Sequence, residues 1–122
     1  MKTDADVVKA LLEGLLSAPL LAFPVMMGRI EGPTQHGVYI VYDPSGTVVH
    51  VGSTPRVRGG VAQRLSDRLS GRTSFAEKHL RGSGYKLRNG YKFRYLIVRD
   101  SRTRALLETY ASGCLSPVEF RL

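Results

Sequence analysis

The stretch that decides the fold is GVYIVYDPSGTVVHVGS, residues 37–53. Two runs rich in β-branched and aromatic residues flank the sequence DPSG, in which Pro44 presets φ and Gly46 accepts a positive φ. This pattern predicts two antiparallel strands, Gly37–Tyr42 and Thr47–Val51, joined by a turn at residues 43–46.

The alternation of side chains along this hairpin predicts what each face carries. With the turn at residues 43–46, Tyr39 lies opposite His50 on one face. The other face is purely apolar and is the expected core face; it carries Val38, Ile40, Val49 and Val51. We therefore expect the face with Tyr39 and His50 to be the less buried one.

The flanking sequence adds helices and a third strand. Apolar residues recur with helical spacing at 7, 8, 11, 12, 15 and 16, after Thr3 or Asp4 as a cap and before Pro19. The chain then runs irregularly to the hairpin. Later elements are expected as helices at 61–71 and 74–82, a strand at 91–100 and a helix from about 100 to Pro117.

This order of elements predicts an α/β fold, in the sense of an α+β layered domain. Its centre is a small three-stranded antiparallel sheet flanked by helices. We expect an N-terminal helical extension at residues 1–30 and the main domain at 31–122.

Charge is unevenly distributed along the 122 residues. The net charge is +8, with 3 basic and 5 acidic residues in 1–50 but 15 basic and 5 acidic residues in 51–122. Thirteen of the eighteen cations are arginines, which suit bidentate phosphate recognition. A nucleic acid is the expected partner; a merely solvated basic surface is the alternative.

Cysteine content and hydropathy point to a cytoplasmic protein. Cys114 is the only cysteine, so no intrachain disulfide can form. The most apolar stretch, residues 15–27, is too short to span a bilayer and holds two prolines. We expect no membrane partner, whereas the N-terminal helix offers a surface for a protein partner or for self-association.

Four features stand in a recognisable order: GVY at 37–39, HVG at 50–52, RLSDR at 64–68 and LLETYASGCLSP at 106–117. In this order and spacing the chain resembles the GIY-YIG nuclease family over residues 36 to 120. The resemblance implies a three-stranded antiparallel sheet flanked by helices. It also implies an endonuclease that uses Mg²⁺ or Mn²⁺ to hydrolyse phosphodiester bonds of nucleic acid, DNA in preference to RNA.

The resemblance also assigns roles by position. Tyr39 matches the first-motif tyrosine at the attacking-water end, Arg64 the arginine that contacts the scissile phosphate, and Glu108 the single metal ligand. The chain departs from the family at His50, where a second tyrosine is usual, and at Ser53, where a lysine is frequent. The asparagine that often follows the terminal proline is absent.

The chemistry of these residue types fits such a reaction. A histidine, with an ordinary pKa of about 6.5, accepts a proton near neutral pH more readily than a tyrosine, whose pKa is about 10. We therefore expect His50 to share or take over the role of general base. The residues expected to contact nucleic acid are Arg56, Arg58, Arg68, Lys78 and His79.

Two alternatives stay open at the level of sequence. Glu108 could simply pair with Arg104, its i−4 neighbour on the helix. The chain could also be a non-catalytic basic module that binds nucleic acid through the same arginines.

Overall fold

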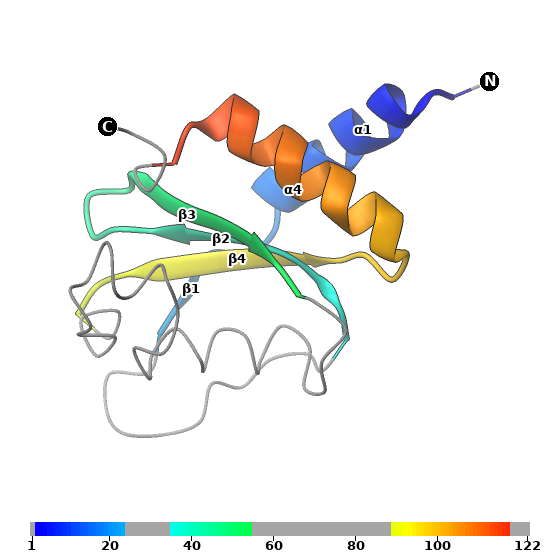
Figure 1. The fold of residues 1–122 in the computed structure, drawn as a ribbon. Coiled ribbons are helices and arrows are strands. Elements are labelled where there is room, and N and C mark those ends of the chain that lie inside the picture. The colour runs from blue at the N-terminus through cyan, green and yellow to red at the C-terminus, as the bar shows by residue number, and fades with distance from the viewer. Residues whose placement is uncertain (1, 24–34, 55–88, 118–122) are drawn as a thin grey trace.

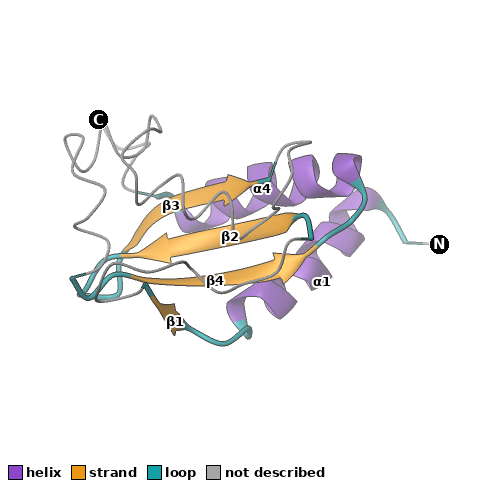
Figure 2. Cartoon of the chain, turned by 90° about the horizontal axis from the view of Figure 1, so that it is seen from below, coloured by secondary structure: helices purple, strands orange, loops and turns teal. Residues whose placement is uncertain are grey.

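The computed structural model describes residues 2–23, 35–54 and 89–117. Within them a four-stranded sheet has the order β1-β4-β2-β3, and every strand pair is antiparallel. Figures 1 and 2 show both described helices on the same face of this sheet. The elements are α1 (Asp4–Leu16), β1 (Leu21–Ala22), β2 (Gly37–Tyr42), β3 (Val48–Ser53), β4 (Lys92–Ile97) and α4 (Ser101–Leu115).

The α+β class and the antiparallel sheet are confirmed, but the sheet has four strands rather than three. The additional strand, β1, has two residues and pairs with β4 through Leu21 and Phe93. The helices expected at 61–71 and 74–82, and the domain boundary expected at 30/31, lie outside the described residues.

Helix α1 begins as its sequence predicts. Thr3 caps it, and its hydroxyl and the Asp6 carboxylate satisfy each other's backbone N–H groups in a capping box. Arg102 bonds the Asp4 carboxylate at one end of the helix, and Arg94 donates to the Leu16 carbonyl at the other. Helix α1 is thus held at both ends by arginines of α4 and β4.

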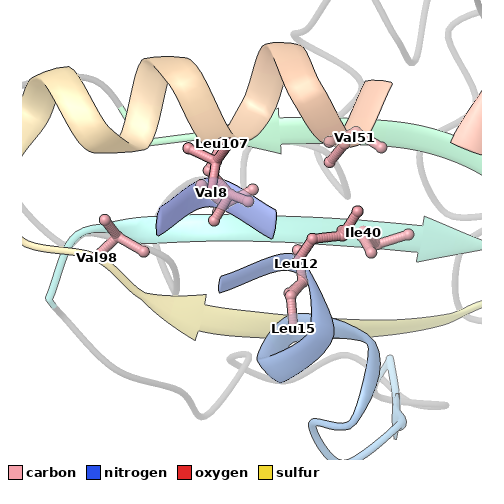
Figure 3. Close-up of a cluster of buried hydrophobic side chains, with 9 residues drawn as sticks. Val8, Leu12, Leu15, Ile40, Val51, Val98 and Leu107 are labelled. Atoms are coloured by element: carbon pink, nitrogen blue, oxygen red, sulfur yellow. The ribbon is translucent and has the colours of Figure 1, made fainter. Parts of the chain in front are cut away.

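The core lies between the two helices and the sheet, as Figure 3 shows. It unites apolar side chains from both helices and from β2 and β3, with Val98 just beyond β4. Its buried members are Val8, Leu12, Leu15, Val38, Ile40, Val51, Val98, Leu107 and Ala111. The N-terminal helix therefore packs on the domain itself; its use by a partner stays a prediction.

A second buried cluster covers the opposite face of the sheet. It contains Phe23, Tyr39, Val41, Val49 and Phe93, with the Phe23 and Phe93 rings 4.8 Å apart. Leu21 of β1 and the buried Phe23 just after it both pack in this cluster.

The predicted register of the hairpin is wrong. The turn spans residues 43–47, because Asp43 Oδ1 accepts hydrogen bonds from the backbone N–H groups of Ser45 and Thr47 and draws Thr47 out of the strand. The hydrogen bond from the Ser45 hydroxyl, with those from the backbone, holds the pKa of Asp43 below its usual value.

A bulge shifts the hairpin register further. Val41 faces His50 while Tyr42 faces Val48, so Val49 is the extra residue on β3. In consequence Val49 packs beside Tyr39, and Val48 packs on the helix-covered face, the reverse of the prediction. The longer turn and the bulge each shift the register by one residue. Because the total shift is two residues, Tyr39 and His50 still lie on the same face.

Gly37, the first residue of β2, is paired with Ile97, the last residue of β4. A Cβ atom at this position would come within 2.2 Å of the Leu96 carbonyl oxygen, a backbone atom that cannot turn aside. The glycine of GVY is therefore required by the packing of two central strands.

No helix in the three described ranges is long and apolar enough to cross a membrane.

Candidate functional site

Tyr39 and His50 meet on the sheet face opposite the helices. The Tyr39 hydroxyl lies 3.5 Å from His50 Nε2, and the ring centroids are 5.7 Å apart with the planes tilted by 49°. Either atom can act as donor in this contact. The two residues share a face of the sheet, as predicted, but they do not lie opposite each other in the ladder.

Gly52 is the reason why the two side chains reach each other. Tyr39 faces Gly52 across the hairpin, and His50 lies two residues before Gly52 on the same strand. A Cβ atom on Gly52 would come within 2.5 Å of the Tyr39 hydroxyl and 2.8 Å of His50 Nε2. The missing side chain lets the Tyr39 ring lie across the strand and end at the imidazole.

The expectation that this face is the less buried one is wrong. Tyr39 has no exposed surface, and His50 is 6 % exposed. Tyr39 belongs to an apolar cluster with Val41, Val49 and Phe93, which explains its complete burial. His50 is thus the member of the pair nearer to solvent.

Glu108 lies on the other side of β3, on the helix-covered face. Its neighbour Leu107 is fully buried in the main core, and this anchors the helix turn that carries the carboxylate. The Ser53 hydroxyl donates a 3.0 Å hydrogen bond to Glu108 Oε2. The residue directly after HVG and the carboxylate of the last helix are thereby joined.

The alternative pairing of Glu108 with Arg104 is not formed. Arg104 is buried, and its Nη1 donates to the carbonyls of Val98 and Arg99, 3.1 and 2.8 Å away. Among the described residues no ion pair joins Arg104 to Glu108. The arginine fastens the start of α4 to the segment that follows β4 rather than pairing with Glu108.

A pocket of about 470 Å³ borders this carboxylate. Its described lining comes from one residue of edge strand β3 and from consecutive turns of α4: Val51, Glu108, Thr109, Ser112 and Gly113. A Cβ atom on Gly113 would meet nothing within 4 Å, in keeping with the open space here.

The structure therefore brings the predicted residues together in two groups rather than one. Tyr39 and His50 share one sheet face, while Glu108 and Ser53 share the other. Both groups border β3, which forms one edge of the described sheet. Along that strand His50 and Ser53 are separated by about 10 Å at the usual rise per residue.

Thr54 and His36 form hydrogen bonds where the start of β2 meets the end of β3. The buried Thr54 hydroxyl accepts from the Gly37 N–H at 3.0 Å and lies 3.0 Å from His36 Nδ1. The Thr54 N–H in turn donates to the Gly37 carbonyl. This clamp fixes the strand ends beside which Ser53 and Glu108 lie.

The remaining predicted site residues lie outside the described residues, and their roles stay predictions. They are Arg64, expected at the scissile phosphate, and the nucleic-acid contacts Arg56, Arg58, Arg68, Lys78 and His79.

Sequence reasoning missed the part played by Ser53 and Gly52. Ser53 was noted only as a departure from the family, yet it is the hydrogen-bond partner of Glu108. A signal was available for Ser53: alternation from Val51, a core residue, puts Ser53 on the same face as the last helix. The function of Gly52 depends on the ring that crosses it, which the predicted register did not contain.

Comparison with known proteins adds no family assignment: no family model matches the chain, and no curated protein matches its sequence.

Proposed function

We propose that this protein is a metal-dependent endonuclease that hydrolyses phosphodiester bonds in nucleic acid, DNA in preference to RNA. The observation that carries the proposal is the contact between Tyr39 and His50 across Gly52. The resemblance to the GIY-YIG nucleases in the order and spacing of the motifs gives this contact its interpretation.

In the proposed reaction His50 acts as general base and Tyr39 orients it. When the Tyr39 oxygen accepts from the His50 Nε2–H, the imidazole carries its basic lone pair on Nδ1 and can take a proton from the attacking water. His50 is also the more exposed of the two residues. Tyr39, fully buried, fixes the tautomer and the ring orientation.

Glu108 is the proposed ligand for Mg²⁺ or Mn²⁺. Among the described residues it belongs to no group of three or more His, Cys, Asp or Glu side chains. A single carboxylate that borders open space suits Mg²⁺, which keeps several waters and binds through one or two carboxylates plus substrate phosphates. When bound, the ion supplies charge stabilisation at the phosphate.

The arrangement around β3 suggests how nucleic acid meets both groups. The strand is an edge of the described sheet, with the Tyr39–His50 pair on one side and the Glu108 pocket on the other. A backbone that passes over this edge near Gly52 comes close to both. Arg64 and the other arginines of residues 51–122 would supply the phosphate contacts in this proposal.

The test is incubation of the full chain with supercoiled plasmid, single-stranded DNA and branched DNA, with Mg²⁺ and with a chelator. We expect at least one substrate to be cut with Mg²⁺ and none with the chelator. Intact substrates under both conditions, with Mn²⁺ tried as well, would contradict the proposal.

A second candidate function is a non-catalytic module that binds nucleic acid. The complete burial of Tyr39 favours it, because a buried phenol cannot touch a phosphate directly. Retention of all three DNAs in a gel shift without any cleavage would select this function.

A further inference from the structure

The hydrogen bond between Ser53 and Glu108 joins two residues 55 positions apart in the sequence. Both side chains are half-buried, at the place where the end of β3 meets the middle of α4. Such a bond forms only in the folded protein. Its acceptor, the Glu108 carboxylate, is the metal ligand in the proposed function.

The fold holds both partners of this bond in fixed positions. Ser53 is the last residue of β3 and is paired with Val38 of the central strand β2. Glu108 follows Leu107, which packs in the same core cluster as Val51, two residues before Ser53. The distance between hydroxyl and carboxylate is therefore set by core packing rather than by chance rotamers on a surface.

One carboxylate oxygen is engaged and the side chain still borders a pocket. Ser53 donates to Oε2, while Glu108 lines the 470 Å³ space with Thr109 and Ser112. A neutral hydroxyl fixes the carboxylate without neutralising it. Arg104, one helix turn before Glu108, is turned to the Val98 and Arg99 carbonyls instead.

We propose that Ser53 is a positioning residue that orients the Glu108 carboxylate for a divalent cation; this rests on the proposed function. A partner that hydrogen-bonds a metal-binding carboxylate restricts its rotation, and removal of such partners typically weakens metal binding about 10–100-fold. The hydroxyl stands where the resemblance leads one to expect a lysine, so the cation here meets a neutral neighbour instead of a charged one.

In the experiment the full chain is titrated with Mn²⁺, and binding is monitored by the paramagnetic broadening of backbone amide signals in NMR spectra. The same spectra report whether the chain is folded. We compare the parent chain with Glu108→Gln, Ser53→Ala and Ser53→Thr. Ser112→Ala is the matched control, since it removes a hydroxyl from the lining of the same pocket, whereas the hydroxyl bonded to Glu108 is that of Ser53.

We expect Mn²⁺ to broaden signals around Ser53 and Glu108 in the parent chain, and Glu108→Gln to remove that effect. Ser53→Ala should require about 10-fold more Mn²⁺, Ser53→Thr should restore most of the affinity, and Ser112→Ala should behave as the parent. Equal affinity in Ser53→Ala and the parent, with loss in Glu108→Gln, overturns the role of Ser53 alone. Unchanged binding in Glu108→Gln, or no binding by the parent, overturns the metal site and with it the role of Ser53.

Discussion

The hydroxyl of Tyr39 lies 3.5 Å from Nε2 of His50, on adjacent strands and over a glycine that leaves the space between them free. The two residues are not opposite each other in the ladder. They meet diagonally, because the tyrosine ring spans the position that a side chain on Gly52 would fill.

Gly52→Ala should separate the Tyr39–His50 pair. The new methyl group would lie within 2.5 Å of the Tyr39 hydroxyl, and the Tyr39 ring is fully buried in an apolar cluster. We expect a loss of about 1–3 kcal/mol in the free energy of unfolding, the usual cost of overpacking a core. Urea denaturation measures it.

Gly113→Ala is the control for this substitution. Its methyl group meets nothing within 4 Å, so the change should stabilise helix α4 by up to about 1 kcal/mol. Equal urea midpoints for Gly52→Ala and the parent chain would show that the tyrosine ring does not occupy the position described.

Some elements of the fold could be predicted from the sequence and others could not. The strand Gly37–Tyr42 was predicted with its observed bounds, and the first helix was predicted with Thr3 as one of two candidate caps and an end before Pro19, because hydrophobic period and caps are local signals. The last helix likewise begins after Asp100, whose side chain accepts from the Thr103 N–H. Local chemistry determines these features.

The features that were missed depend on contacts between distant residues. The two-residue strand Leu21–Ala22 exists through its pairing with β4, and no periodicity can be seen in two residues. The hairpin register depends on side-chain hydrogen bonds of Asp43 and on a bulge. Alternation along β3 places Ser53 on the face of the last helix, but its bond to Glu108 depends on how α4 crosses the sheet, which no sequence pattern reports.

Asp43 should make the hairpin sensitive to acid. Hydrogen bonds from the Ser45 hydroxyl and from the backbone keep its pKa in the folded protein below the ordinary value of about 3.9. A carboxylate with a lowered pKa stabilises the fold above that ordinary value, and this contribution is lost as the pH falls through the lower, folded value. We expect the urea midpoint of unfolding to decrease as the pH is lowered below about 4.

Asp43→Asn is the matched variant, because the amide oxygen can still accept the turn hydrogen bonds but does not titrate in this range. Its urea midpoint should fall less between pH 5 and pH 3 than that of the parent chain. Parallel curves would show that the hydrogen bonds to Asp43 do not favour its charged form.

The basic residues should make binding to duplex DNA strongly dependent on salt. If several phosphates are contacted, log affinity should fall with log salt by about 0.9 per phosphate.

Arg56→Gln or Arg58→Gln should flatten this slope, while Arg64→Gln should reduce cleavage more than binding. Arg102→Gln is the control, because Arg102 is already paired with Asp4; an affinity independent of salt would refute the interface.

His50 should give cleavage its pH dependence. A base must be neutral to accept a proton, so the rate should rise with pH as His50 loses its proton. His50→Ala should slow cleavage about 10²–10⁴-fold, the usual contribution of a general base, and abolish this step. His50→Tyr should move the pH dependence upward. A profile unchanged in His50→Ala would show that His50 is not the base.

The central claim is that a cation held by Glu108 is needed to cut nucleic acid, and Glu108→Gln tests it most directly. The measurement is the rate of supercoiled-plasmid nicking at fixed Mg²⁺ by the parent chain, by Glu108→Gln and by Glu13→Gln, which makes the same change at an exposed position of helix α1. We predict nicking by the parent and by Glu13→Gln, and none by Glu108→Gln, with the fold and the DNA binding of all three intact. Nicking by Glu108→Gln at the parental rate would contradict the account.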